Sequence, residues 1–408
     1  MLRRDSNNFL NDIVEYGVFH HIRKSSTNLI ATTNDAYPDA DYFSSIKNLY
    51  SEDDLVDWFN EHLSLFVNLL PQNNVNFLLA SGGVDSSALA ALIYNNNNTE
   101  IIHSAYVNHD QNDIEKLNSL TNKYSFKTNI FHLSEDEYLS GSRLLWKNRI
   151  SQNTYSPTLS YCLSKIEFSE KSTLITGSGP DELFYGMEKY PFSLFESLKD
   201  LEITKALKQI DTPYNLESYK KVLSVEGLEI LKNILNERNT LYKRISEIVE
   251  SILEAQRILA WCTVTNQHVN LFDTIASIHG VRHLSPFLNK ELVDIALSIP
   301  INKLIDIKRN NQNVEIGKSH LKRYLLKFFD KDHVYSKKIG FHAPVSKFIH
   351  SKIYRNEFNF NYEYFPSIFD KDKLIKKVKY DLDKGIDLQG DYFLYSILNI
   401  YNLVKKEF

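Results

Sequence analysis

A short run of small residues between an apolar segment and a helical segment constrains this chain most. Residues 75–80 are mostly apolar and predict a buried strand, residues 81–87 read SGGVDSS, and residues 86–94 have the composition of a helix. Glycines let the backbone approach a ligand, and the amides and dipole at a helix N-terminus favour an anion. A carboxylate such as Asp85 beside a phosphate indicates a bridging Mg²⁺, which takes hard oxygen ligands. The run therefore predicts a nucleotide or pyrophosphate site with a metal ion.

A second run of glycines and carboxylates follows another strand-like segment. Residues 173–176 predict a short buried strand, and residues 177–186 read GSGPDELFYG. Open parallel sheets bind ligands at the carboxyl ends of their strands, which is where this run lies. The alternative for the segment is an Asp-Glu pair that caps a surface helix.

The order of the other segments predicts an α/β fold. Strand-like runs at 101–107 and 128–133 alternate with helical spacing at 113–124. This alternation implies a doubly wound parallel sheet with flanking helices. From about residue 190 onward the pattern is mostly helical, through residues 223–259 and 292–329. We expect this helical half to pack on the sheet edge and to close the site.

Composition narrows the classes of partner and compartment. The 408 residues carry 47 Lys and Arg against 51 Asp and Glu, so no basic field for a polyanion exists and nucleic acid is an unexpected partner. Cys162 and Cys262 are far apart and no C-x-x-C occurs, which favours buried free thiols in a reducing cytosol. The first residues turn polar at once, and no apolar run approaches the roughly 18 residues of a membrane span. We expect a cytoplasmic protein without membrane contact.

Both runs of small residues match known signatures. The chain has no G-x-x-x-x-G-K-[ST] motif, and SGGVDS instead resembles the pyrophosphate loop (PP-loop) of the ATP pyrophosphatase superfamily, which leaves several families open. The second run is similar to the S-G-E-G-x-D-E-L-F-x-G signature of the asparagine synthetase family. The resemblance covers roughly residues 50–408. Further matches follow in the order of that family at residues 271–273, 285–293, 317–322, 337–344 and 394–401.

The resemblance implies a domain organisation. Residues 1–48 are expected to form an extension, because residues 10–17 weakly resemble the linker between the two domains of that family. Residues 49–408 are expected to form the synthetase domain, with an adenine nucleotide alpha-hydrolase-like PP-loop core at about 70–190 and a helical part at about 190–408. The glutaminase nucleophile of the family is a Cys directly after the initiator Met, where this chain has Leu2, so we expect no glutaminase domain. Nitrogen would then come from ammonia, from an amine or from a separate glutaminase subunit.

The resemblance also implies a reaction. The superfamily cleaves ATP to AMP and pyrophosphate and adenylates an oxygen of the substrate, so ATP and Mg²⁺ are the expected cofactors. The expected substrates are a carboxylic acid and ammonia or an amine. Attack of a carboxylate on the α-phosphorus requires neutralised phosphate charge and in-line alignment.

Specific residues carry this reaction if the resemblance holds. Lys318 matches the family lysine that stabilises developing negative charge, and its alternative is an exposed helix lysine. Glu182 is the second expected catalytic residue, and Asp85 and Asp181 are the expected Mg²⁺ ligands. The substrate is expected at Ser178 and Gly179. ATP and pyrophosphate are expected at Ala80, Ser81, Gly82, Gly83, Asp85, Ser86, Val107, Thr176, Gly177, Lys337 and Lys338.

Two departures from the family pattern point to a product other than asparagine. The family glutamate of S-G-E-G, which is tied to aminolysis of the aspartyl adenylate, is Ser178 here, and the Arg and Asp that flank P-F-L are Leu284 and Asn289. We expect a divergent member, such as a peptide cyclase, a β-lactam-forming synthetase or an amide-forming enzyme of natural-product or surface-sugar biosynthesis. Two other functions stay open: a non-catalytic pseudo-synthetase that acts as a scaffold or regulatory subunit, and a PP-loop enzyme that modifies nucleic acid.

Overall fold

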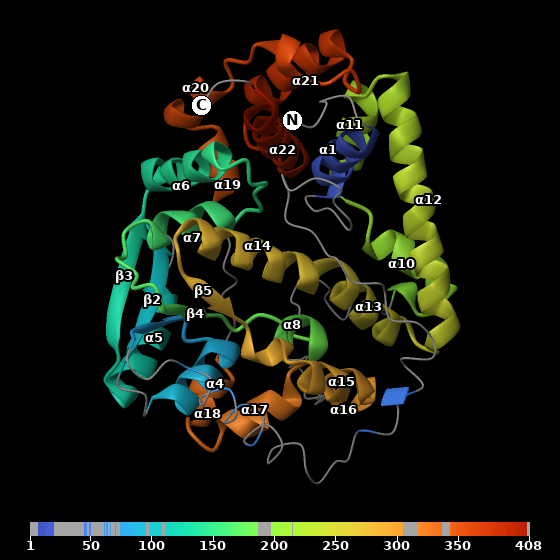
Figure 1. Cartoon of the computed structure of the whole chain (residues 1–408). Coiled ribbons are helices and arrows are strands. Elements are labelled where there is room, and N and C mark those ends of the chain that lie inside the picture. The colour runs from blue at the N-terminus through green and yellow to red at the C-terminus, as the bar shows by residue number, and fades with distance from the viewer. Residues whose placement is uncertain are drawn as a thin grey trace.

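The computed structural model of this chain is shown in Figure 1. The structure describes residues 7–19, 45–46, 74–94, 98–107, 111–186, 197–213, 215–304, 317–336 and 343–405, together with the single residues 49, 61, 63, 66 and 70. Side chains at 7, 8, 19, 111–113 and 264–267 are not described.

A five-stranded parallel sheet lies on one side of the molecule (Figure 1), and its strands have the order β3-β2-β1-β4-β5. The chain moves outward from β1 to β3 and returns to β4 on the other side of β1, so the strand order reverses between β1 and β4. The loops after these two strands therefore border the crevice where open parallel sheets bind ligands. The strands are β1 Asn76–Leu79, β2 Thr99–Tyr106, β3 Lys127–Leu133, β4 Thr173–Ile175 and β5 Arg282–Leu284.

Helices cover both faces of the sheet, as a parallel sheet requires. Successive strand residues point to opposite faces, so Phe77 and Leu174 join one apolar core while Leu78 and Ile175 join the other. The first core contains residues of α6 Glu135–Lys147, α7 Ser156–Leu163 and α14 Asn266–Ile278. The second contains residues of α4 Val84–Ile93, α5 Gln111–Tyr124, α15 Lys290–Ser298 and α17 Ser319–Leu325.

A helical region extends the first core away from the sheet. The helix α1 packs against α12 and α22 (Figure 1), and its residues Leu10, Ile13 and Val14 are buried there. The remaining described helices are α1 Asn7–Phe19, α8 Pro180–Leu183, α10 Ile203–Ile210, α11 Leu216–Val222, α12 Val225–Ile248, α13 Ile252–Ala260, α16 Ile301–Leu304, α18 Lys331–Val334, α19 Val345–Ile349, α20 Lys352–Glu357, α21 Lys371–Lys384 and α22 Leu388–Val404. Of these, α8, α16 and α18 contribute residues to the second core. A π-helical turn at Trp261–Thr265 connects α13 to α14, and 3₁₀ turns lie at Pro286–Leu288 and Tyr362–Tyr364.

A buried arginine joins α13 to the end of α15. Arg257 donates through Nη1 to the carbonyls of Ala296 (3.2 Å) and Ile299 (3.0 Å), and through Nη2 to the carbonyl of Leu297 (3.0 Å). The last carbonyls of a helix lack intrahelical partners and carry partial negative charge, so a cation is favourable there. Burial lowers the pKa of this guanidinium to about 10, against the opposing effect of Glu254, and the group stays charged at neutral pH.

The α/β fold with a helical C-terminal region is confirmed. The four strands expected before residue 180 correspond to β1 to β4, but β5 was not predicted, because three residues inside a helical pattern carry too little periodicity. The division of the chain at residue 48 stays a prediction. Among the described residues, no helix combines the length and the apolar character needed to cross a membrane.

Candidate active site

The segment after β1 turns sharply into α4. Gly82 has a φ of +75°, and a Cβ at this position would lie 2.7 Å from the backbone of Lys116 on α5, so a side chain would not fit. The Ser81 hydroxyl accepts a hydrogen bond from the Gly83 amide (3.3 Å), and the Ser86 hydroxyl accepts one from the Ser81 amide (3.4 Å). Amides in the first turn of a helix have no intrahelical acceptor. The ordered loop and the start of α4 can therefore cradle an anion.

The segment after β4 lies against this loop. A Cβ at Gly177 would lie 3.1 Å from the Cβ of Asp85, which is closer than side chains ordinarily approach. Glycine therefore lets the two loops meet. The backbone then turns at Gly179, with a φ of +108°, into the short helix α8, whose first turn carries Asp181 and the buried Glu182.

A buried lysine connects the two loops. Lys318 Nζ lies 2.5 Å from Asp85 Oδ2 and 2.5 Å from Asp181 Oδ1, and only 6% of its side chain is exposed. Burial alone would lower the pKa of this ammonium, but the two carboxylates outweigh burial and raise its pKa above the ordinary value. Lys318 is thus a charged group at the meeting point of the loops, and the alternative of an exposed helix lysine is wrong.

Two glycines clear the path of this side chain. A Cβ at Gly186 would lie 1.9 Å from Lys318 Cε, and a Cβ at Gly317 would lie 1.6 Å from the carbonyl oxygen of Tyr185. The Lys318 amide donates to the carbonyl of Phe184 (2.7 Å), which fixes the start of α17 along the segment after α8. The position of the ammonium therefore depends on the close passage of two backbone segments.

The two aspartates fit a magnesium ion. Mg²⁺ in proteins is usually held by one or two carboxylates, with phosphate oxygens and waters completing its shell. Asp85 and Asp181 converge on one cation, and within the described ranges no group of three or more His, Cys, Asp and Glu side chains could hold a metal. Two carboxylates beside an anion cradle match an ion that shares its ligands with a bound nucleotide.

A second polar cluster lies at the carboxyl ends of β4 and β5. His283 Nδ1 lies 2.6 Å from Asp273 Oδ1, and His283 Nε2 lies 2.8 Å from Thr176 Oγ1 and 3.1 Å from Ser285 Oγ. Thr176 Oγ1 is also 2.8 Å from Ser285 Oγ and 3.2 Å from Ser178 Oγ. A carboxylate, an imidazole and three hydroxyls thus form one connected network, and one of its members, Ser178, lies in the loop that leads to Asp181.

The comparison with protein families agrees with this geometry. The model of the family described as asparagine synthase matches residues 72–359, which include both loops, Lys318 and the imidazole network. The chain belongs to the asparagine synthase family. Membership supports an ATP-dependent, amide-forming synthetase at the level of the family. Comparison with curated proteins gives no match.

The structure places most residues expected in an asparagine synthase site around the crevice between β1 and β4. Ala80 directly follows β1 and is buried, and Val107 directly follows β2 with 49% of its surface exposed. Glu182 is buried in α8, beside Asp181. Lys337 and Lys338 lie outside the described residues. The individual roles of all these residues stay predictions.

Sequence reasoning missed two histidines at the site. His283 alternates with Ser285 directly before the P-F-L segment, and this alternation on a strand was the one signal that could have found it. His333 on α18 approaches the first loop, with Nε2 2.9 Å from Ser87 Oγ, and Ser87 in turn donates to the carbonyl of Gly82 (3.1 Å). No local pattern indicates His333, because its partner is 246 residues away in sequence.

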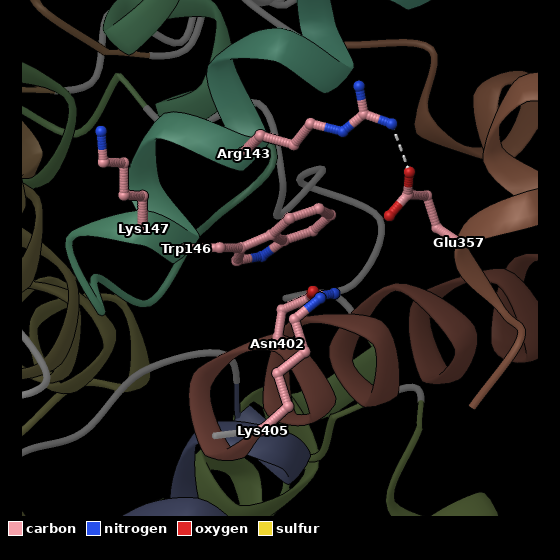
Figure 2. Close-up of a pocket in the computed structure, with 6 residues that line it drawn as sticks. All are labelled: Arg143, Trp146, Lys147, Glu357, Asn402 and Lys405. Atoms are coloured by element: carbon pink, nitrogen blue, oxygen red, sulfur yellow. Dashed lines mark hydrogen bonds and ion pairs between the residues drawn. The ribbon is translucent and has the colours of Figure 1, made fainter. Parts of the chain in front are cut away.

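A separate cavity of about 340 Å³ lies between α6, the end of α20 and α22 (Figure 2). Arg143 and Glu357 form an ion pair of 2.6 Å beside it, as Figure 2 shows. The side chains that line it are Arg143, Trp146, Lys147, Glu357, Asn402 and Lys405, and none of them is an expected site residue.

Proposed function

We propose that this chain is an AMP- and pyrophosphate-forming ligase that adenylates a carboxylate and forms an amide with ammonia or an amine. The observation that carries the proposal is the Lys318 ammonium held between Asp85 of the first loop and Asp181 of the second. An anion cradle, a buried cation and two convergent carboxylates are the groups that phosphoryl chemistry on ATP requires.

The residues of the chain then have distinct tasks. The loop of residues 81–86 and the first turn of α4 bind the β- and γ-phosphates through backbone amides and hydroxyls. Lys318 neutralises charge that grows on the α-phosphate as the carboxylate oxygen attacks. Asp85 and Asp181 would hold Mg²⁺, which when bound would supply charge neutralisation on the phosphates. The loop from Gly177 to Gly179, which passes closely over Asp85, borders the acyl group.

The product is an amide other than asparagine. Ser178 stands where the family signature has a glutamate, and its hydroxyl faces a threonine rather than a charged group. A site built this way receives an acid and an amine of its own, as in a peptide or β-lactam cyclase or an amide-forming enzyme of natural-product or surface-sugar biosynthesis.

The test is pyrophosphate exchange into ATP, screened over proteinogenic amino acids, small dicarboxylic acids, short peptides and uronic acids. Exchange that depends on one acid, with AMP and pyrophosphate as products, is the expected result. ADP and phosphate as stoichiometric products would sink the proposal. Nucleotide binding without any exchange would favour the scaffold, and turnover stimulated by RNA would favour nucleic-acid modification.

Asp85→Asn is the matched variant for this screen. It keeps the size of the side chain but removes a charge that pairs with Lys318 and is expected to hold Mg²⁺. We expect Mg²⁺-dependent exchange to disappear while the far-ultraviolet circular dichroism of the folded chain stays unchanged, because Asp85 lies in the first turn of α4 with 21% of its side chain exposed and is not part of an apolar core.

A further inference from the structure

The network around His283 forms a chain of hydroxyls that ends on a buried nitrogen. The distances are 3.2 Å from Ser178 Oγ to Thr176 Oγ1 and 2.8 Å from Thr176 Oγ1 to His283 Nε2. Ser178 is half-buried in the loop that carries Asp181, whereas the side chain of His283 is 1% exposed. The chain therefore leads from the border of the proposed acyl site into the protein interior.

The partners of the imidazole set the direction of these hydrogen bonds. Asp273 can only accept when ionised, so His283 Nδ1 donates to it at 2.6 Å. In the neutral imidazole, Nε2 is then an acceptor, and the closer of the two hydroxyls that can donate to it is Thr176 Oγ1 at 2.8 Å, against 3.1 Å for Ser285 Oγ. Because a hydroxyl donates one hydrogen, a Thr176 that donates to His283 accepts from Ser178. In this arrangement Ser178 and Thr176 are oriented to pass a proton toward His283.

We propose that Ser178, Thr176 and His283 form a proton relay that takes a proton from the nitrogen nucleophile. This proposal rests on the proposed ligase function. When the amine nitrogen forms its bond to the acyl carbon of the adenylate, it must lose one proton. That proton passes to Ser178 Oγ, the proton of Ser178 passes to Thr176 Oγ1, and the proton of Thr176 passes to His283 Nε2. AMP leaves with the electron pair of the acyl–oxygen bond, and the imidazolium returns its proton to solvent after the amide departs.

The surroundings of His283 suit a group that charges during turnover. An imidazolium in a buried position is costly without a counter-charge, and Asp273 supplies one at 2.6 Å. Half of the Asp273 side chain, 53%, remains exposed, so this carboxylate keeps contact with solvent. The ring of Phe272 packs beside the imidazole at 5.4 Å between centroids and limits its rotation. The relay takes over the role in aminolysis that the family resemblance assigns to a glutamate at the position of Ser178.

The alternative is a satisfied polar cluster that only holds β4 against β5. The two half-reactions separate these cases, because adenylation releases no proton from an amine. His283→Gln keeps an acceptor for Thr176 but cannot take a proton. We expect pyrophosphate exchange, with the acid that is most active in the screen, to stay within about twofold. Amide formation with ammonia should fall by about 10²–10⁴-fold, the usual contribution of general base catalysis.

A second variant locates the effect. Thr176→Val interrupts the chain at constant volume and should reproduce the loss. Hydroxylamine, an unprotonated and strong nucleophile at neutral pH, should narrow the gap between wild type and His283→Gln. Equal loss of both half-reactions, or no loss in His283→Gln and Thr176→Val, would overturn the relay.

A measurement without substrate keeps the two proposals apart. In the intact protein with ¹⁵N-labelled histidine, the signals of His283 are assigned by their absence in His283→Gln. We expect an unprotonated Nε2 and a protonated Nδ1 at neutral pH, and a protonated Nε2 would overturn the relay whatever the substrate. If Nε2 is unprotonated but no acid in the screen supports exchange by the wild type, the ligase function has failed and the relay falls with it.

Discussion

Lys318 and Arg257 are both buried cations, yet their surroundings differ in kind. Lys318 lies between two ionised side chains that retain contact with solvent, at the meeting point of the two loops. Arg257 lies in the helical region and donates to three backbone carbonyls at the end of α15. The pKa of Lys318 is raised because Asp181 and Asp85 outweigh burial, whereas burial lowers the pKa of Arg257 to about 10.

This difference teaches how to separate a site cation from a structural one. Main-chain carbonyls cannot move away from Arg257 without unwinding α15, so that guanidinium is tied to the fold. The carboxylates around Lys318 are side chains in the first turns of α4 and α8, and they can change partners without unwinding either helix. Loss of Lys318 should therefore reduce turnover more than stability, and loss of Arg257 should do the reverse.

The largest expected effect is on turnover in Lys318→Ala. A cation that stabilises transition-state charge contributes about as much as an oxyanion donor, so kcat for pyrophosphate exchange should fall by about 10²–10³-fold. The KM for ATP should change much less, because the interaction strengthens as charge develops. Steady-state exchange kinetics of the purified variant measure both constants.

Lys318→Arg is the control for charge alone. The planar guanidinium does not fit a point-charge position between two carboxylates, so it should restore only part of kcat. The urea midpoint of Lys318→Ala should fall modestly, because Asp85 and Asp181 can rehydrate once the ammonium is gone. Near-normal turnover in Lys318→Ala would place the charge elsewhere, and a variant that simply unfolds would make Lys318 equivalent to Arg257.

The second-largest expected effect is on the stability of the Arg257→Met variant. Methionine keeps apolar volume but leaves three carbonyls without their donor, and the free energy of unfolding should fall by about 2–4 kcal/mol. Urea unfolding followed by circular dichroism measures the change. Lys232→Met on α12, where the lysine side chain is 67% exposed in a surface ion pair, should be almost neutral. Folded Arg257→Met should exchange pyrophosphate normally, and a selective loss of kcat would contradict the structural role.

The two thiols provide a neutral counterpart to these cations. Burial raises the pKa of Cys162 on α7 and of Cys262 after α13 from 9.0 to about 12. Between these values the unfolded chain loses protons that the native state retains, so stability falls as the pH rises above about 9. At pH 10 this ionisation should lower the free energy of unfolding by about 1.4 kcal/mol for each thiol, and a Cys→Ala variant lacks the effect. The difference in stability between wild type and each variant should therefore change by about 1.4 kcal/mol between pH 8 and pH 10. A pH-independent difference between wild type and variant would show that the thiols are accessible in the native state.

The sequence was sufficient for the features whose signal is local. β1 to β4 and both loops could be located because apolar runs and glycine–carboxylate motifs are contained within a few neighbouring residues. The burial of Lys318 could not be predicted, since it requires Asp85 and the segment from Asp181 to Gly186, which are far apart in sequence, to converge on the lysine. The network of His283 was missed for the same reason: β5 has only three residues, and its polar side chains acquire meaning only beside Thr176.

His333 is a third basic side chain, which is half-buried, and its partner is the hydroxyl of Ser87 in α4, neither a carboxylate nor a carbonyl. The Ser87 hydroxyl donates to the carbonyl of Gly82, so it accepts from His333 Nε2, which lies 2.9 Å away. Burial lowers the pKa of His333, with Lys116 and Lys123 adding to this effect and Asp330 opposing it. The imidazole is therefore neutral at pH 7 and holds the loop through a single neutral hydrogen bond.

The smallest expected effect is a loss of ATP affinity in His333→Ala. One neutral hydrogen bond contributes about 0.5–1.5 kcal/mol, so the KM for ATP should rise by about 2- to 12-fold while kcat changes little. His333→Gln can still donate to Ser87 and should recover most of the affinity. Ser87→Ala should resemble His333→Ala, and the double variant should be no worse than either, because both remove the same contact. An additive double variant would mean that His333 acts on another group. A drop in stability as large as that of Arg257→Met would class His333 with the structural cation, and a drop in kcat alone would class it with Lys318.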